Sequence, residues 1–537
     1  MLKETFRFFF PLITGLVLCF LLVPSCAVIK APTGGPKDTI PPFALGSIPK
    51  NYTRNFVGQN ITILFNEFIK IKDQSNSIQI SPEPEKAPLI KVVQKSIEIT
   101  FKTPLEKNRT YSINFGNSII DYNEGNPLNN FRYVFSTGPL LDSLKISGRV
   151  SDPLDTSAKK DVYVILHSAG NDSAILKKKP FLFTTTDKDG TFSLENLPAG
   201  KYNLYALEET NRNKRYDNKD EKIAFLKNSI TLKRDTTGVQ LNLFKESDTV
   251  LKLMKKSIKA GLFRAIFSIA NDSLQFTAGP SIKNKKYIIE PHGKGDSLYI
   301  WLANPNQDSI LVKVNYKNHK PLLLVQQNFN KPKKIIPFST EDNIKQDLLS
   351  PEEPLSIKFT RPVPLLTLEN IIIQEDSIKS SPDSVLKADS SFRKYKIYYP
   401  WLPNKKYHLK LKAGAIQDIF SATNLEYNHA FTYGEEKNYG IINLHVTIAH
   451  PGSYIIELMD DNFHIIKSTI IKENTVIPYH YLIPGKYRIR AIYDTNKNGR
   501  FDTGDVMKKI QPERIVNSKE ISIRSNFEIN PGFPLPN

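Results

Sequence analysis

The stretch Ser96-Ile97-Glu98-Ile99-Thr100-Phe101 alternates polar and apolar side chains with a period of two. Thr110-Tyr111-Ser112-Ile113-Asn114-Phe115 repeats this alternation shortly afterwards. Because successive side chains of a strand point to opposite faces, the pattern predicts strands with one face buried. Similar short stretches recur along the chain, and no long helical periodicity appears beyond the N-terminal segment. The sequence therefore predicts an all-β fold made of tandem β-sandwiches.

The chain repeats two kinds of segment in the same order. Leu402–Leu409 matches the pattern of Leu105–Ile113, and Ile483–Ala491 matches that of Leu197–Ala206. A chain of 537 residues is too long for one hydrophobic core, so the repetition predicts separate domains. The segment between the two copies is also rich in strand-forming residues and has no second copy. The predicted domains are A1 (43–139), B1 (140–247), a middle domain (248–345), A2 (346–436) and B2 (437–537).

The N-terminus has the pattern of a secretory signal. A short charged head is followed by the apolar run Phe8–Val23, and Pro24, Ser25 and Cys26 come directly after this run. The run is shorter than the roughly 18 apolar residues needed to span a bilayer. The pattern predicts a signal peptide over residues 1–25. The Pro- and Gly-rich residues 26–42 then form a tether.

A cysteine directly after a small residue at the end of such a run resembles the lipobox of bacterial lipoproteins. The resemblance implies cleavage before Cys26 and attachment of a diacylglycerol and a fatty acyl group to it. Cys19 lies inside the signal, so the mature chain keeps one cysteine, which excludes an internal disulfide and a cysteine metal cluster. Ala27 replaces the aspartate that favours inner-membrane retention, and the resemblance therefore points to the outer membrane, on either face. An ordinary cleaved signal or an uncut anchor helix remains the alternative.

The formal net charge is +19 at pH 7. The lysines are scattered, and the densest clusters lie at 177–179, 283–286 and 331–334. We expect them at solvated hairpin tips and sheet edges, where lysine also prevents strand-to-strand aggregation. Weak attraction to anionic lipid headgroups is the alternative. Without a motif that combines base stacking with basic residues, no nucleic-acid partner is predicted.

Two family resemblances cover most of the mature chain. Domain A1 resembles the bacterial Ig-like domain of surface-layer proteins through Ile61–Glu67, Pro104-Leu105 with Tyr111, and Phe135–Gly138. The B domains resemble the prealbumin-like sandwich known as the carboxypeptidase-regulatory-like domain, and Thr186–Phe192 and Leu197–Tyr202 carry this match. Domain B2 lacks the Asp-x-Asp-Gly turn. The resemblances imply a cell-envelope protein with a structural or binding role, and they supply no catalytic residues.

The sequence of B2 contains a candidate calcium loop. The loop runs Asp494-Thr-Asn496-Lys-Asn498-Gly499-Arg500-Phe-Asp502-Thr-Gly-Asp505. Side-chain oxygens fall at loop positions 1, 3, 5, 9 and 12, with glycine at 6 and the Arg500 carbonyl at 7, as in EF-hand loops that bind Ca²⁺. The predicted ligands are Asp494, Asn496, Asn498, Arg500, Asp502 and Asp505. The alternative is a polar turn without metal, because Asp, Asn and Gly favour turns in any case.

Domain B1 has a related loop, Glu209-Thr-Asn211-Arg-Asn213-Lys214-Arg-Tyr-Asp217-Asn-Lys-Asp220. The oxygen spacing is kept, but Lys214 replaces the glycine. We expect this copy to be a solvated loop, and a second calcium loop is the alternative.

Enzyme signatures are missing from the sequence. The nine histidines form no His-Glu-x-x-His motif, and no Gly-x-Ser-x-Gly elbow occurs. We therefore predict a non-enzymatic envelope lipoprotein that displays β-sandwich domains as a structural or binding module. One alternative is a glycan- or protein-binding adhesin, which predicts exposed aromatic residues around Trp301 or Trp401. A less favoured alternative is an envelope hydrolase with its site in the middle domain, or with Glu67 and Asp121 as paired carboxylates.

Overall fold

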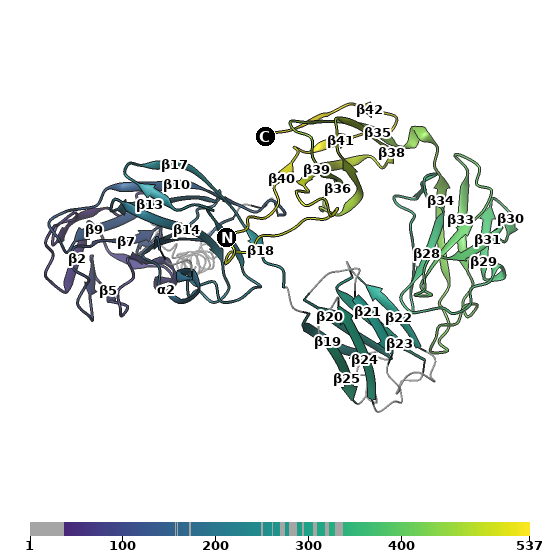
Figure 1. Cartoon of the computed structure of the whole chain (residues 1–537), viewed down its shortest axis with the longest axis horizontal. Helices are drawn as coiled ribbons and strands as arrows, with labels where there is room; N and C mark the ends of the chain where they lie inside the picture. Colours follow the sequence, from purple (N-terminus) through teal and green to yellow (C-terminus); the bar gives the residue numbers. More distant parts are fainter. Residues whose placement is uncertain are drawn as a thin grey trace, which may run out of the picture. The chain divides into compact units, whose positions relative to one another are not determined.

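The computed structural model is nearly all β, which confirms the predicted fold class (Figure 1). The predicted signal peptide, Cys26 and the first part of the tether lie outside the described residues. The structure describes residues 37–537 except 156, 158, 171–172, 249–250, 260, 269–273, 279–286, 293–294, 304–308, 317–321 and 328–336.

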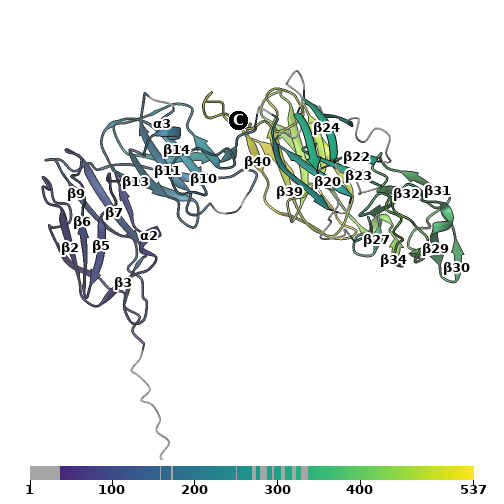
Figure 2. The same cartoon turned by 90° about the horizontal axis from the view of Figure 1, so that it is seen from below.

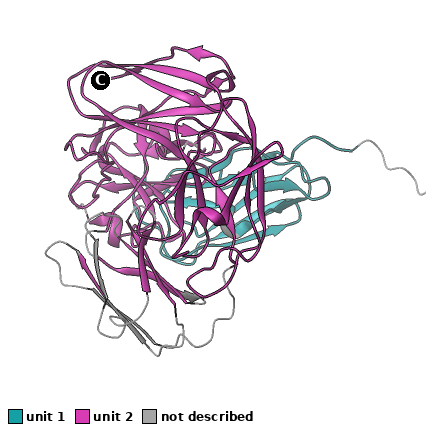
Figure 3. Ribbon diagram, turned by 90° about the vertical axis from the view of Figure 1, so that its right-hand side faces the viewer, with its two compact units in different colours: residues 1–141 teal, residues 142–537 magenta. Residues whose placement is uncertain are grey.

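The chain divides into two compact units, residues 1–141 and 142–537, which Figure 3 colours separately. The predicted domain A1 lies in the first unit, and the other predicted domains lie in the second. No helix of the described part is long and apolar enough to cross a membrane. The described α-helices are the single turns α2 (Gln74–Ser77) and α3 (Ala174–Lys177).

Unit 1 is built from two main sheets and one short strand pair. The first sheet has the order β1 (Ala44–Ile48), β2 (Asn60–Phe65), β6 (Ser96–Thr100), β5 (Leu89–Val93). The second has the order β4 (Gln79–Ser81), β7 (Thr110–Gly116), β9 (Phe131–Ser136). The short pair is β3 (Ile69–Ile71) with β8 (Ile119–Asp121).

The apolar side chains of the period-two stretches fill the core of unit 1. Ile97 and Ile99 of β6 are buried, whereas Glu98 between them is exposed. From the second sheet, β7 contributes Ile113 and Phe115 to the same apolar cluster. Full burial of one such side chain stabilises the fold by roughly 1.5–3 kcal/mol. The stretches that decide the fold in the sequence are therefore the ones that build this core.

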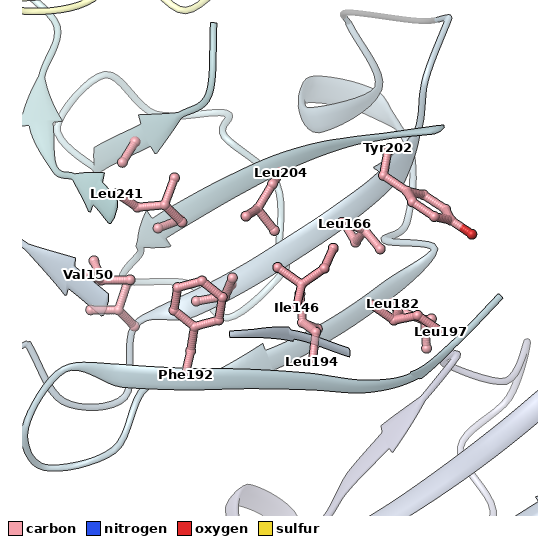
Figure 4. Close-up of a cluster of buried hydrophobic side chains, with 14 of the residues drawn as sticks. Ile146, Val150, Leu166, Leu182, Phe192, Leu194, Leu197, Tyr202, Leu204 and Leu241 are labelled. Atoms are coloured by element: carbon pink, nitrogen blue, oxygen red, sulfur yellow. The ribbon is translucent and has the colours of Figure 1, made fainter. Parts of the chain in front are cut away.

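The first part of unit 2 also forms a sandwich. Figure 4 shows its core, in which Val150, Phe192, Leu204 and Leu241 lie among the buried side chains. One sheet has the order β13 (Thr191–Leu197), β10 (Leu144–Ser151), β17 (Thr236–Asn242). The other is β12 (Leu182–Thr185), β11 (Tyr163–Ser168), β14 (Gly200–Glu208), β15 (Lys222–Phe225), β18 (Phe244–Lys245), with β16 (Ile230–Leu232) beside β14.

The next part of unit 2 has one sheet of four strands and one of three. The first has the order β19 (Leu253–Lys259), β20 (Leu262–Phe267), β23 (Ser297–Leu302), β22 (Tyr287–His292). The second has the order β21 (Leu274–Ala278), β24 (Ser309–Tyr316), β25 (Leu322–Gln327).

Residues 340–433 repeat the strand order of unit 1. Their first sheet runs β26 (Thr340–Asp342), β28 (Leu355–Phe359), β32 (Lys394–Tyr398), β31 (Ser384–Lys387). Their second runs β27 (Leu348–Leu349), β34 (Tyr427–Tyr433), β33 (Lys406–Leu411), β29 (Ile371–Glu375), β30 (Ile378–Ser380).

Residues 440–535 repeat the sandwich of residues 144–245, including a central strand that has one antiparallel and one parallel side. One sheet runs β38 (Thr475–Leu482), β35 (Gly440–Ile448), β42 (Glu528–Ile529), with β43 (Gly532–Leu535) also on β35. The other runs β37 (Ile465–Ile471), β36 (Tyr454–Asp460), β39 (Gly485–Tyr493), β40 (Ile515–Asn517), with β41 (Ile521–Ile523) on β39.

The two repeats also share individual hydrogen bonds. The hydroxyl of Tyr111 accepts the N–H of Glu106, and the hydroxyl of Tyr407 accepts that of Leu402, each at 3.0 Å. In the B-type sandwiches a tyrosine hydroxyl donates to a carbonyl four residues earlier. These pairs are Tyr202 with Pro198 and Tyr487 with Ile483. The sequence echoes therefore correspond to the same local structure.

The turn Asp187-Lys188-Asp189-Gly190 is tight, as the sequence predicts, but it does not join the two strands of a hairpin. Gly190 has a φ of 78°, and its N–H donates to the Asp187 carbonyl. The strands on either side, β12 and β13, belong to different sheets of the sandwich. The turn therefore carries the chain across the core.

The lysine cluster 177–179 also differs from the prediction of a hairpin tip. Lys177 ends the short helix α3 instead of standing at a hairpin tip. The other two clusters, 283–286 and 331–334, lie outside the described residues.

Within unit 2, the last sandwich contacts the first sandwich. Val506 is buried in an apolar cluster with Tyr216, Phe225 and Phe244, which belong to the first sandwich of the unit. The N–H of Val506 donates to the Glu246 carboxylate at 2.6 Å. Two further hydrogen bonds cross the contact, from Thr503 to the Lys245 carbonyl and from Gln511 to the Phe225 carbonyl. Figure 2 shows both sandwiches, marked by β14 and β39.

We predict that Val506→Ala loosens this contact. The lost methyl groups and the cavity they leave lower the free energy of unfolding by roughly 2 kcal/mol. Hydrogen exchange should become faster in residues 216–225 as well as in 503–511. Met507→Ala is the control, because Met507 is half exposed and its removal changes stability by about 0.5 kcal/mol or less. Unchanged exchange in 216–225 would show that the two segments do not depend on each other.

Candidate functional site

The predicted calcium loop connects β39 with β40 and begins at a buried carboxylate. Asp494 Oδ1 accepts the N–H of Asn498 at 2.9 Å. Oδ2 accepts the hydroxyl of Ser453 at 2.9 Å and the N–H of Gly499 at 3.1 Å. Burial by itself raises the pKa of Asp494, but these hydrogen bonds outweigh it and hold the pKa below its usual value. The Asp494 carboxylate is therefore negatively charged at neutral pH, at the first position of the loop.

The structure brings Asn496, Asn498 and Asp502 together. Both asparagine amides donate to Asp502 Oδ2, at 2.5 Å from Asn496 and 2.6 Å from Asn498. The carbonyl oxygen of the Asn498 side chain accepts the N–H of Arg500 at 2.9 Å. Three of the predicted ligand side chains thus converge, and in this conformation amide N–H groups satisfy the Asp502 carboxylate.

Asp505 is held away from this group. Its carboxylate accepts the backbone N–H of Lys508 and the Lys508 ammonium, each at 2.9 Å. The residue at loop position 12 is therefore engaged in a separate turn. Across the described residues, no three His, Cys, Asp or Glu side chains are arranged as a ready-made metal site.

Sequence reasoning missed Glu513, which accepts hydrogen bonds from both ends of the loop. Its carboxylate is largely buried and accepts the N–H of Thr495 at 2.7 Å and that of Asp502 at 3.0 Å. Glu513 thus ties the two ends of the loop together. It lies well outside the EF-hand spacing, so no pattern in the sequence connects it with Asp494.

The related loop after β14 has the same internal hydrogen bonds. The Glu209 carboxylate accepts the N–H of Asn213 at 3.1 Å and that of Lys214 at 2.9 Å. The amides of Asn211 and Asn213 donate to the Asp217 carboxylate at 3.2 and 2.6 Å. Lys214 adopts a φ of 59°, close to the 75° of Gly499, so the backbone bend is kept without glycine.

A buried carboxylate, Glu221, directly follows this loop. Glu221 is only 1% exposed, and its Oε1 makes no hydrogen bond with any described residue. Oε2 accepts the N–H of Asn218 at 3.4 Å, and the backbone N–H groups of Thr210 and Asp217 also stabilise the charged carboxylate. Burial raises the pKa of Glu221, and the neighbouring Asp217 carboxylate adds to the rise. Burial also raises the pKa of Glu209, with Glu221 contributing. Mutually repelling carboxylates therefore gather here.

The aromatic residues proposed for an adhesin are packed inside the protein. Trp301 is 1% exposed, and its indole N–H donates to Glu290 at 2.9 Å. Trp401 is partly buried and contacts Tyr399 and Tyr407 at ring-centroid distances of 4.7 and 5.0 Å. The expectation of an exposed aromatic patch at Trp301 is thus wrong, because this ring fills a core.

Of the two carboxylates considered for a hydrolase, Glu67 accepts the side-chain amide N–H of its neighbour Asn66 at 3.2 Å. Asp121 is buried and accepts the N–H groups of Glu124, Gly125 and Asn126 at 2.6 to 2.8 Å, so it holds a turn. Its counterpart Asp418 accepts two backbone N–H groups and pairs with the buried Arg361 at 2.7 Å. In the middle domain, Glu290 pairs with Arg393 at 2.7 Å. All these carboxylates are satisfied by fixed donors.

A histidine–carboxylate group was also missed from the sequence. His429 Nδ1 lies 2.6 Å from Asp342 Oδ2, which also accepts the Tyr427 hydroxyl at 2.7 Å, and Nε2 lies 3.4 Å from Asp347. Burial lowers the pKa of His429, but the two carboxylates outweigh it and raise the pKa above its usual value. The group is an ion pair between strands that lie far apart in the sequence.

Comparisons with known proteins agree with the local fold. Residues 38–137 match the bacterial Ig-like domain family. This match covers the described part of unit 1, including Ile61–Glu67 and Phe135, which carry the resemblance in the sequence. No curated protein matches the chain.

Three solved structures illustrate the similarity, each with a low TM-score. The Bacillus anthracis TIE protein is 12% identical, with 94% of this chain and 75% of that chain covered and a TM-score of 0.15. The major pilin subunit BcpA of Bacillus cereus is 11% identical, with coverages of 74% and 99% and a TM-score of 0.15. The Bacteroides ovatus mixed-linkage glucan utilization locus protein SGBP-B is 11% identical, with coverages of 72% and 95% and a TM-score of 0.18. At these scores the similarities carry no functional argument.

We predict that His429→Gln destabilises its domain in a pH-dependent way. The raised pKa means that protonated His429 contributes stability fully below about pH 6.5 and loses it as the pH rises through the folded-state pKa. The melting temperature of the variant should fall by about 4 °C relative to the unmodified protein at pH 5.5. The two proteins should converge by pH 9. A difference that stays constant with pH would contradict the ion pair.

Proposed function

We propose that this protein is a non-enzymatic lipoprotein of the bacterial cell envelope, which displays rigid β-sandwich domains as a structural or binding module. The observation that carries the proposal is the match of residues 38–137 to the bacterial Ig-like domain, combined with the repetition of both sandwich types. The carboxylates that an enzyme would use, such as Asp121 and Asp418, hold turns in this structure. A display role needs no reactive group, and it uses the stiffness of packed sheets.

The anchor in this proposal is Cys26. A thioether-linked diacylglycerol and an amide-linked fatty acid would hold the mature N-terminus in a bilayer, since each buried CH₂ group contributes about 0.8 kcal/mol. The Pro- and Gly-rich tether then separates the first domain from the lipid. The proposed location is the outer membrane, on a face that the fold does not determine. The proposed partner is an envelope protein or glycan.

Cys26→Ala should move the protein from the membrane fraction to the soluble fraction and abolish palmitate labelling. The physical reason is that the variant has no thiol to accept the diacylglycerol. Cys19→Ala is the matched control, because Cys19 lies in the signal that is removed, and this variant should stay labelled and membrane-bound. Membrane retention of Cys26→Ala after a carbonate wash would contradict the anchor.

We also propose that the loop at 494–505 binds Ca²⁺. Asp494 and Asp502 supply charge, and the side-chain carbonyls of Asn496 and Asn498 and the backbone carbonyl of Arg500 supply neutral oxygens, all of them hard ligands that suit this cation. Binding requires the two asparagine amides to release Asp502. Asp505 takes part only if its bond to Lys508 breaks, and the loop is supported by Glu513 in either case.

The test is the melting temperature of the mature chain in calcium and in chelator. Calcium at 100 times its dissociation constant should stabilise the folded state by about 2.7 kcal/mol. Asp502→Ala should reduce the number of bound Ca²⁺ ions by one. Asp505→Ala should leave that number unchanged if the bond to Lys508 persists. Equal calcium binding by Asp502→Ala and the unmodified chain would contradict a site in this loop.

A further inference from the structure

Exposed aromatic side chains gather at the end of unit 1 where the described chain begins. Phe43 and Phe68 are each 53% exposed, and Tyr122 is 61% exposed. The last two are neighbours in space, because the N–H of Tyr122 donates to the Phe68 carbonyl at 2.9 Å. Phe43 joins them through Asn66, whose side-chain oxygen accepts the N–H of Phe43 at 2.7 Å. We call these three aromatic residues the tether-end patch. Exposed apolar side chains that gather in this way mark a protein or membrane contact.

Two lysines place their ammonium groups over rings of the tether-end patch. Lys95 Nζ lies 5.5 Å from the ring centroid of Phe68, and Lys70 Nζ lies 5.5 Å from that of Tyr122. The same ammonium groups donate to backbone carbonyls, from Lys95 to Asn66 at 3.0 Å and from Lys70 to Tyr122 at 2.9 Å. Aromatic rings beside lysines are typical of the surface of a bilayer, where the rings lie at the level of the headgroups and the lysines reach the phosphates.

A hollow of about 620 Å³ opens beside the tether-end patch. Its lining residues include Lys70 and Lys72, which can pair with a phosphate, and Asn117, which can donate hydrogen bonds to one. The apolar residues Ile120 and Pro127 also line it. Basic residues next to apolar ones suit a lipid headgroup, which carries its anionic phosphate on an apolar stem.

Carboxylates offset most of the positive charge at this end of unit 1. Because the net charge is small, attraction to an anionic surface is modest, and apolar contact has to supply most of the binding energy. The exposed or half-exposed carboxylates near the lysines are Asp38, Glu67, Asp73 and Glu124.

The tether-end patch lies where a chain anchored at its N-terminus would enter unit 1. The side-chain amide of Asn126, in the loop after β8, donates to the Asp38 carbonyl at 2.9 Å, which holds the start of the described chain at this end. β9 is the last strand of the unit. It begins near the same end, where Phe131 packs on Phe65 with the ring centroids 5.8 Å apart, and it runs away from there. Figure 2 shows the described N-terminal residues next to β3, at the end of the unit that carries the patch.

The length of the tether keeps this end of unit 1 close to the lipid. Under the proposed function Cys26 is held in the bilayer, and ten residues, 27–36, separate it from Lys37. Such a segment spans at most about 40 Å. Confinement within this distance gives the patch a high effective concentration at the lipid surface, so a weak affinity is enough to keep it there.

We propose that the tether-end patch docks on the phospholipid surface that holds the anchor. Phe43, Phe68 and Tyr122 lie at the level of the headgroups, and Lys70 and Lys72 contact a lipid phosphate. This inference deepens the proposed function and rests on its lipid anchor for the place of docking. Docking turns unit 1 so that the chain leaves it on the side away from the lipid, which suits a protein that displays its later domains.

The experiment uses the mature chain with Cys26→Ala, which has no lipid, and measures its co-sedimentation with vesicles of equal parts phosphatidylglycerol and phosphatidylcholine. This parent chain should bind the vesicles reversibly. Adding Phe68→Ala and Tyr122→Ala should weaken the binding at least about tenfold, because two exposed rings no longer leave water at the lipid surface. Adding Lys70→Gln and Lys72→Gln instead should weaken it more on these vesicles than on pure phosphatidylcholine.

The matched control replaces two exposed apolar side chains outside the patch, with Tyr52→Ala and Val57→Ala. Tyr52 is 60% exposed and Val57 is 94% exposed. This variant should bind the vesicles as the parent chain does. Since every substituted side chain is exposed, all variants should keep the circular dichroism spectrum and melting temperature of the parent chain.

Three results would overturn the proposal. In the first, the parent chain does not bind the vesicles. In the second, the variant with Phe68→Ala and Tyr122→Ala binds them as well as the parent chain does. In the third, the parent chain is a dimer in ultracentrifugation without lipid and this variant is a monomer, which would show that a second copy covers the patch. Palmitate labelling of Cys26 can persist in all three cases. Absent labelling with intact, patch-dependent vesicle binding would instead contradict the anchor alone, so the two failures are distinguishable.

Discussion

The burial of alternate side chains between two facing sheets is the constraint on which the described structure depends. The mature chain of the proposed lipoprotein has one cysteine, so no disulfide within it can support the sandwiches. Ile97, Ile99 and Ile113 show the arrangement in unit 1, where each side chain fills the core while its neighbours along the strand face outward. Since this packing uses every second position of a strand, functional side chains are left to the loops at the ends of the sheets.

The internal duplication explains why the two acidic loops share a design. Both follow the long central strand of a B-type sandwich, β14 or β39, and both fold around an acidic residue that accepts the backbone N–H groups of the bend. The later parts of the loops differ. The second loop continues through Asp505 and places Val506 in the apolar cluster of the first sandwich, whereas the first loop contributes Tyr216 to that same cluster. The two copies of one module thus meet through the segments that carry their acidic residues.

This placement connects the proposed calcium loop at 494–505 with the contact between the sandwiches. Glu246 accepts the N–H of Val506 and is flanked by the lysine side chain of Lys219, which extends from the first loop. A cation that orders the loop at 494–505 would reduce the freedom of the segment that holds this contact, and the free energy of binding would appear as stability of the contact. The display role and the proposed calcium loop therefore concern the same property, which is the stiffness of the protein.

Sequence alone predicted the all-β class, the strands around Ile61, Ile97 and Ile113, and the echoes between repeats, because these depend on a period-two pattern and on turn chemistry within a few residues. It also located the loop at 494–505 from the spacing of oxygen-bearing residues. It did not predict that Trp301 is buried, that Asp505 pairs with Lys508, or that Glu513 and Glu221 lie beneath the loops. The Asp505–Lys508 pair is local, but it forms in a turn that the oxygen spacing does not reveal. The burial of Trp301 and the hydrogen bonds to Glu513 depend on residues that the sheets bring together from separate parts of the chain, and only the tertiary structure decides those contacts.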